Sequence, residues 1–270
     1  MINFLFWNLN KKLLQLNIKN LANNFDVDIF MFAECNILPD TLLRALNQDS
    51  VLYYHSRNIG CQKITIYTRF SSDFLIPKRE TSRITIRHLT LPGLRDILLA
   101  VLHLPSKFDW SSPSQSSECY EVANMIKEAE QEVGHSRTIL VGDFNMNPFE
   151  DGFVSANGFN AVMSRRIAGR KNRIVQKREY PFFYNPMWNY FGDETAGPPG
   201  TYFYNVYEHI GYFWNMFDQV LIRPELLTCI DNNSVKILDS DGTRSFLNSQ
   251  GIPDSKIVSD HLPILFKINL

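Results

Sequence analysis

Polar side chains follow several of the most apolar stretches of this 270-residue chain. Asn8, Glu34 and Asp143 each come directly after a β-rich apolar run, and the pair Asp260-His261 comes directly before one. Residues at strand ends are the ones that an α/β sandwich exposes to a shared cleft. Asn145 follows Asp143 by two residues, so three carboxylates, two amides and a histidine in one cleft could hold a hard metal ion and a phosphate. The sequence therefore predicts a site for a divalent cation and a phosphate group.

The elements that must position these side chains are predicted from hydrophobic periodicity. Strands and helices alternate, then strands run together, then the alternation returns, which favours two packed sheets with helices outside. We interpret residues 83–88 as part of a strand with one face in water, because Arg83, Thr85 and Arg87 alternate with apolar positions. The predicted strands are 2–7, 27–33, 51–54, 63–68, 74–77, 82–89, 96–104, 138–141, 216–222 and 262–268, and the predicted helices are 11–25, 39–46 and 113–133.

Composition narrows the function classes. The 27 basic and 28 acidic residues give a net charge of −1, so any binding of nucleic acid must come from local clustering of charge. The four cysteines are scattered and form no C-x-x-C pair, which argues against a zinc site. No signal peptide and no membrane span is visible, so we expect a cytoplasmic enzyme. No repeat or linker interrupts the chain, so we expect one domain over residues 1–270.

Six sequence blocks resemble the endonuclease/exonuclease/phosphatase superfamily, which includes the pancreatic-type deoxyribonucleases and the abasic-site endonucleases. They occur in the family's order and cover essentially the whole chain. The resemblance implies an α/β fold, namely a four-layer α/β sandwich of two packed mixed sheets flanked by helices, as in deoxyribonuclease I. The blocks are Phe6-Trp7-Asn8-Leu9-Asn10, Phe32-Ala33-Glu34, His103-Leu104-Pro105-Ser106, Gly142-Asp143-Phe144-Asn145, Phe217-Asp218-Gln219-Val220-Leu221 and Ser259-Asp260-His261-Leu262-Pro263.

The resemblance implies a metal side of the site. Glu34 would ligate Mg²⁺ or Mn²⁺, because a carboxylate suits a hard ion that keeps most of its waters. Asp260 would reach the same ion directly or through water, and Asn10 would line this side.

It also implies a catalytic side. Asp143 would orient and deprotonate the attacking water, Asn8 would hold Asp143 in place, and the amide of Asn145 would donate to the phosphate or the water. His261 would contact the scissile phosphate, with Asp218 fixing its tautomer and favouring its charged form. His103 matches a second histidine of deoxyribonuclease-like members and could protonate the leaving group or bind the phosphate.

Several positions depart from individual branches of the superfamily. Asn10 and Asn215 replace an aspartate and a tryptophan of the abasic-site endonucleases, which puts that specificity in doubt. Gln62 is our best placement for the glutamate that pairs with the second histidine of deoxyribonucleases, so a general-acid role for His103 is less secure. Gln219 stands where inositol-polyphosphate phosphatases carry an arginine, which disfavours that branch. The other histidines, His55, His88, His135 and His209, match no block and are interpreted as structural or surface residues.

A basic and then aromatic segment, loop-rich and at about 164–205, follows the Asp143 block. Seven cations and no acid occur over residues 165–178, and aromatic residues follow. Cations for phosphates and aromatic faces for bases are typical of a groove that binds a single strand. The alternative is a solvated basic loop followed by aromatics that pack in a minor core. The residues predicted to bind nucleic acid are Arg165, Arg166, Arg170, Lys171, Arg173 and Trp188.

These observations together predict a Mg²⁺-dependent phosphodiesterase that hydrolyses nucleic acid, with DNA as the favoured substrate and an endo- or exonuclease as the favoured activity. Two alternatives stay open: a phosphatase or phosphodiesterase of a small or lipid-linked phosphate ester, and a catalytically idle protein that binds nucleic acid. The sequence does not determine an oligomeric state.

Overall fold

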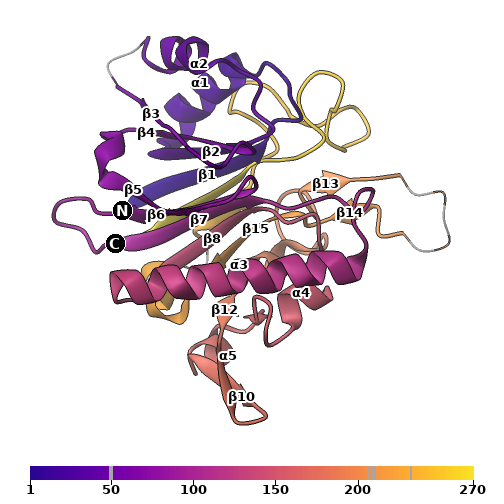
Figure 1. The fold of residues 1–270 in the computed structure, drawn as a ribbon. Coiled ribbons are helices and arrows are strands. Elements are labelled where there is room, and N and C mark those ends of the chain that lie inside the picture. The colour runs from indigo at the N-terminus through magenta and orange to yellow at the C-terminus, as the bar shows by residue number, and fades with distance from the viewer. Residues whose placement is uncertain (49–50, 206, 208, 210, 232) are drawn as a thin grey trace.

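The computed structural model describes residues 1–48, 51–205, 207, 209, 211–231 and 233–270. Two large sheets pack face to face, and helices cover the outer face of each (Figure 1). Helices α1 (Gln15–Phe25) and α2 (Pro39–Leu46) cover one sheet, and α3 (Ser112–Val133) covers the other. The predicted four-layer α/β sandwich is thus confirmed.

The first sheet has six strands in the order β16-β17-β1-β2-β4-β3. It is mixed, because β1 and β2 run parallel while the other neighbours run antiparallel. Its strands are β1 (Ile2–Asn8), β2 (Ile29–Ala33), β3 (Tyr54–Ser56), β4 (Ile64–Thr68), β16 (Val235–Ile237) and β17 (Ile264–Ile268).

The second sheet has seven strands in the order β5-β6-β7-β8-β15-β12-β9. Here β7 and β8 form a parallel pair in the middle of the sheet. Its strands are β5 (Leu75–Glu80), β6 (Ile84–Leu89), β7 (Ile97–His103), β8 (Thr138–Asp143), β9 (Ala161–Val162), β12 (Phe183–Tyr184) and β15 (Asp218–Ile222).

Short elements lie at the edges of the sandwich. Two ribbons are β10 (Asn172–Val175) with β11 (Arg178–Pro181), and β13 (Tyr202–Phe203) with β14 (Trp214–Asn215). The remaining helical turns are η1 (Ser72–Phe74), α4 (Asp151–Val154), α5 (Arg165–Ala168), η2 (Pro186–Tyr190) and η3 (Pro224–Cys229).

Helix α3 shows why the sequence forms these layers. The Ser111 hydroxyl caps its first turn by accepting from Ser114 N, and Pro113 occupies a position where a missing N–H costs nothing. Gly134 ends it at φ 74°, a left-handed conformation that glycine adopts without strain. Its buried stripe, which includes Val122 and Ile126, packs on the apolar outer face of β6, β7 and β8. Within the described ranges, none of the helices combines the length and the apolar character that a membrane span requires.

The prediction that one face of β6 is exposed to solvent is wrong. Thr85 and Arg87 are 0% and 1% exposed, because this face is turned toward the other sheet. The Arg87 guanidinium donates to Glu80 Oε1 at 2.6 Å and to the Arg57 carbonyl at 2.9 Å, so the buried charge is paired. Alternation predicted the strand correctly, but it could not distinguish a solvated arginine from one neutralised inside the sandwich.

Three further expectations needed adjustment. The strand predicted at 51–54 is β3, which begins at Tyr54, and positions 49–50 lie outside the described residues. The helix predicted from residue 11 begins at Gln15, because Asn10 and Lys11 have φ values of 44° and 59° and form a turn instead. The segment at about 164–205 holds α5, the β10–β11 hairpin, β12, η2 and β13 among its loops.

Candidate active site

The strand register brings the chain's polar strand ends together. Asn8 pairs with Ala33 at the end of the parallel β1–β2 pair, and Glu34 follows at once. His103 pairs with Asp143 at the end of the parallel β7–β8 pair. Asp218 is opposite Asp143 at the start of antiparallel β15. One edge of the sandwich therefore gathers these residues from both sheets.

Asp143 is the centre of this group. Its carboxylate is 1% exposed and is held at both oxygens. Asn8 Nδ2 donates to Oδ2 at 2.9 Å, and the backbone N–H of Asn145 donates to Oδ1 at 2.9 Å. The first hydrogen bond joins the two sheets across 135 residues of sequence. The Asp143 carboxylate is therefore fixed in orientation before any substrate arrives.

His261 and Asp218 form a buried pair. Asp218 Oδ2 lies 2.7 Å from His261 Nδ1, so Nδ1 carries a hydrogen and Nε2 points into the site. Burial raises the pKa of Asp218 to about 6, although the charge of His261 opposes that shift. Burial alone would lower the pKa of His261, but the negative charges of Asp218 and then Asp143 outweigh it and raise the pKa to about 10. Between these values the pair consists of an imidazolium and a carboxylate.

His103 behaves differently. Its Nε2 lies 3.6 Å from Asp143 Oδ2 and 3.7 Å from Glu34 Oε1, and its Nδ1 is buried without a hydrogen-bond partner among the described residues. Burial lowers its pKa, although Asp143 and Glu34 pull the other way. The His103 imidazole is thus neutral at pH 7. Neither Gln62 nor any other described residue fixes its tautomer.

The metal side has unsatisfied oxygen donors, which is what a hard cation requires. On this side, Asp260 Oδ1 is buried and has no hydrogen-bond partner within the described part of the chain. Glu34 has a left-handed backbone with φ 48°, and its carboxylate is a quarter exposed. One donor atom each from Asp143, Asp218 and His261 lies within 4.8 Å of the others, a spacing that could also admit a cation. The residues present fit a divalent ion.

Asn10 and Asn145 flank these groups through their backbones. The N–H of Asn10 donates to Asn8 Oδ1 at 3.0 Å, which orients the amide that holds Asp143. Asn145 has φ 52°, and one of its side-chain N–H groups donates to the Leu104 carbonyl at 2.9 Å. A second side-chain N–H and the amide oxygen of Asn145 are left for other contacts.

Sequence reasoning missed residues that support the pair. Thr201 Oγ1 accepts from Asp218 N at 3.0 Å, and the Tyr202 ring lies 4.7 Å from the His261 ring, centroid to centroid. Thr201 directly precedes β13, and Tyr202 begins this two-residue strand, which is too short to show periodicity, so no pattern pointed to them. Ser259 and Trp7 lie inside the quoted blocks and were given no role. Ser259 Oγ donates to the Asn8 carbonyl at 2.7 Å, and Trp7 Nε1 donates to the His261 carbonyl at 2.9 Å.

The predicted nucleic-acid contacts divide into two groups. Arg166, Arg170 and Lys171 are exposed. Arg165 Nη1 instead donates to the carbonyls of Leu227 and Ile230, and its guanidinium covers the Tyr184 ring.

The other two residues predicted to bind nucleic acid also make contacts within the protein. Arg173 donates to the Val154 carbonyl at 2.9 Å. Trp188 is half-buried beside Phe149, with 6.2 Å between the ring centroids. The β10–β11 hairpin projects from the sandwich beyond α5 (Figure 1).

Comparison with known proteins identifies relatives. Residues 5–261 match the sequence model of the Endonuclease/Exonuclease/phosphatase family. No curated protein sequence matches the chain. Among solved structures, a protein of this family from Leptotrichia buccalis C-1013-b is 16% identical, with TM-score 0.58 and coverage of 100% of both chains. D. rerio TDP2 complexed with single strand DNA product is 15% identical, with TM-score 0.57 and coverage of 100% of this chain and 99% of the other.

The endonuclease domain of TRAS1, described as a telomere-specific non-LTR retrotransposon, is 18% identical, with TM-score 0.53 and coverage of 100% of this chain and 99% of the other. At these identities the structural matches establish the fold.

Proposed function

Because this chain belongs to the Endonuclease/Exonuclease/phosphatase family and is a metal-dependent phosphodiester hydrolase, we propose that it cleaves nucleic acid as a Mg²⁺- or Mn²⁺-dependent DNA endo- or exonuclease. One observation carries the chemistry. The doubly held carboxylate of Asp143 lies 3.9 Å from the Nε2 of His261, whose charge is maintained by Asp218. A base for water and a cation for phosphate are thus adjacent.

The cation would be held by Glu34 and Asp260, with Asn10 beside them. A protonated His261 offers no lone pair to a metal, so the oxygen donors outside the His261–Asp218 pair suit the ion better than the pair does. When bound, a divalent cation neutralises phosphate charge and assists the leaving oxygen.

The side chains of this protein perform the remaining steps. Asp143 accepts the proton of the attacking water, and Asn8 keeps its carboxylate aimed. His261 donates from Nε2 to a phosphate oxygen, where negative charge grows in the transition state. His103 is neutral, so it binds the phosphate or the leaving oxygen by hydrogen bonding rather than supplying a proton as a strong acid.

Exposed cations support nucleic acid as the substrate. Arg166, Arg170 and Lys171 are exposed on α5 and at the base of the β10–β11 hairpin, where they can contact phosphates. The relatives add weight to this choice, because one is described as an endonuclease domain and another as complexed with a DNA product. A cytoplasmic location stays a prediction.

The test is a substrate panel with matched controls. Purified protein is incubated with single-stranded and duplex DNA, RNA, a minimal aryl phosphodiester and lipid-linked phosphate esters, each with Mg²⁺, with Mn²⁺ or with EDTA. We expect metal-dependent cleavage of DNA that disappears in Glu34→Ala and in Asp143→Asn. Preference for a small or lipid-linked ester would replace the nuclease proposal. Binding of DNA without hydrolysis of any substrate would make the protein an idle binder.

A further inference from the structure

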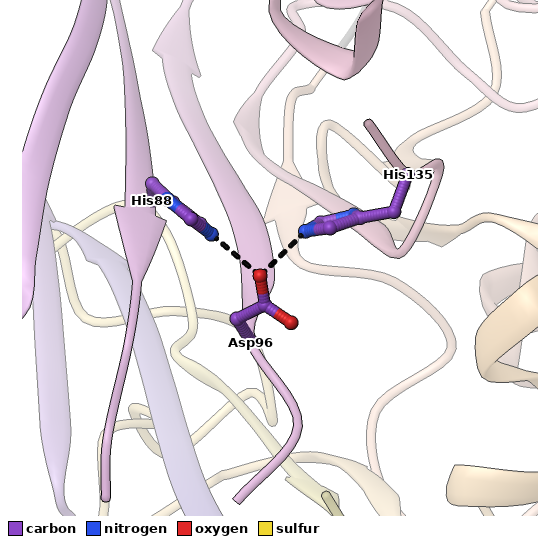
Figure 2. A group of neighbouring side chains, drawn as sticks. All are labelled: His88, Asp96 and His135. Carbon is purple, nitrogen blue, oxygen red and sulfur yellow. Dashed lines mark hydrogen bonds and ion pairs between the residues drawn. The ribbon is translucent and has the colours of Figure 1, made fainter. Parts of the chain in front are cut away.

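Two histidines outside the candidate active site converge on one carboxylate. His88 lies in β6 and His135 lies in the connection from α3 to β8, and both direct Nε2 at the same oxygen of Asp96 (Figure 2). Asp96 Oδ2 is 2.8 Å from His88 Nε2 and 3.1 Å from His135 Nε2. We propose that these three residues form a second metal site, which takes a first-row transition-metal ion such as Zn²⁺.

The donor set selects the kind of metal. Two imidazole nitrogens and one carboxylate oxygen suit Zn²⁺ and its neighbours, whereas Mg²⁺ prefers oxygen ligands alone. The donor atoms of the three residues all lie within 4.8 Å of one another. Donors around a tetrahedral zinc ion lie about 3.3 Å apart, since each bond is about 2.0–2.1 Å long. The cluster is therefore close to ligation geometry and needs only a slight opening. It uses none of the cysteines, whose spacing argued against zinc.

Access and support are both present. The side chains of His88, Asp96 and His135 are 16%, 36% and 8% exposed, so an ion can enter and keep a water in its fourth position. Arg137 binds the second oxygen of Asp96 through Nη2, and its Nε donates to the Asp96 carbonyl at 2.7 Å. A ligating carboxylate that is itself hydrogen-bonded in this way stays oriented for the metal.

Ligation has one structural cost. The backbone N–H of Arg137 donates to His135 Nδ1 at 3.2 Å, which places the hydrogen of the neutral ring on Nε2. For Nε2 to bind an ion, that hydrogen must move to Nδ1 and the hydrogen bond is lost. Loss of this hydrogen bond should lower the affinity for the metal ion by roughly tenfold, compared with an identical site in which His135 Nδ1 accepts no hydrogen bond.

The location indicates what the ion does. Asp96 immediately precedes β7, and His103 ends that strand, so the cluster and the candidate active site are separated by the seven residues of β7, about 23 Å at 3.3 Å per residue. An ion here cannot touch the reacting phosphate. It would tie the β6–β7 turn to the segment that leads into β8. Its role is therefore structural, and its binding should stabilise the second sheet.

Cobalt is the direct probe. The intact protein is stripped with a chelator, given excess Mg²⁺ to fill oxygen-ligand sites, and titrated with Co²⁺ while visible absorption is recorded. We expect one equivalent of Co²⁺ with nitrogen-ligand absorption in the wild type, and loss of that signal in His88→Gln and in His135→Gln. His55→Gln, which removes a histidine elsewhere, should keep the signal. Absence of the signal in the wild type, or its persistence in both cluster variants, would overturn the proposal.

Thermal melting tests the structural role with Zn²⁺. At a hundredfold excess over the dissociation constant, the wild-type melting temperature should rise by roughly 5 °C or more. His88→Gln should melt cooperatively without responding to Zn²⁺, and it should still hydrolyse substrate in Mg²⁺ because His88 is remote from the reaction. A zinc response of equal size in His88→Gln would show that the ion binds elsewhere.

Discussion

Asp143 is the residue on which the proposed chemistry depends most. Asp143→Asn preserves the shape that Asn8 and the Asn145 N–H recognise, and it removes the base. We expect turnover to fall by at least about 10²–10⁴-fold, with affinity for substrate kept. Single-turnover cleavage and equilibrium binding measured on the same variant separate the two effects. Cleavage near the wild-type rate would assign the proton to another group.

The His261–Asp218 pair predicts a pH profile. The proposed mechanism requires ionised Asp218 and protonated His261, so activity should rise with pH through about 6 and fall again near 10. In Asp218→Asn the imidazole loses the charge that raises its pKa, so the alkaline limb should move to lower pH. Rate profiles of the two proteins with an aryl phosphodiester measure this. An unchanged alkaline limb in the variant would show that Asp218 does not set the charge of His261.

His261 and His103 should differ in how much each contributes to turnover. His261→Ala removes a charged donor held at 2.7 Å by Asp218, whereas His103→Ala removes a neutral ring whose Nδ1 has no partner among the described residues. We expect the larger loss of turnover from His261→Ala, and little further loss when Asp218→Ala is added to it. Equal defects from the two single histidine variants would count against the role given to His261.

At the scale of elements, α3 is attached to the second sheet by a buried ion pair. Glu130 of α3 accepts from Arg223 Nε at 2.8 Å and from the Thr138 hydroxyl at 2.7 Å, and both charged side chains are less than a tenth exposed. Glu130→Gln leaves a buried guanidinium unpaired, so unfolding free energy should drop by about 3–5 kcal/mol in urea titrations. The matched control Glu121→Gln, at an exposed position of the same helix, should leave the midpoint almost unchanged. Similar midpoints for the two variants would mean that the pair does not anchor α3.

Elements with strong periodicity could be predicted, and those that depend on tertiary contacts could not. The helix predicted at 113–133 is Ser112–Val133, because capping and an apolar stripe both mark it. The β10–β11 hairpin turns through Gln176 and Lys177, both with positive φ, and this pair lacks the Asn-Gly signature of such turns. β16 is only three residues long and becomes a strand by pairing with β17. The polar strand ends of the site were predictable because local sequence marks them, whereas Thr201 supports Asp218 only through the fold.

At the scale of the whole molecule, local charge rather than net charge should govern substrate binding. Replacing Arg166, Arg170 and Lys171 by serine should flatten the salt dependence of DNA binding by about 0.7–0.9 in log–log slope per lost contact. Hydrolysis of an aryl phosphodiester should be unaffected, because these cations are outside the catalytic group. The measurement is a salt titration on catalytically inactive Asp143→Asn protein.

The control is an equal change of charge elsewhere. Arg44, Arg95 and Lys236 are also exposed, on α2, before β7 and on β16. Their replacement by serine should leave the slope as in the parent protein. If replacing Arg166, Arg170 and Lys171 also leaves the slope at the parent value, these three cations do not contact DNA. The small-ester alternative would then be favoured.

The two hydrogen bonds that join Trp7 and Asn8 to His261 and Ser259 span 254 and 251 residues of sequence. β17, which lies between β16 and β1, pairs the first strand with the last. During synthesis, one edge of β1 therefore has no partner until residues 264–268 have emerged from the ribosome, whereas β2 can pair with the other edge much earlier. A nascent chain without residues 259–261 lacks His261 and the contacts that hold Asn8. The candidate active site can therefore be complete on a nascent chain only after residues 259–268 have emerged and β17 has docked beside β1.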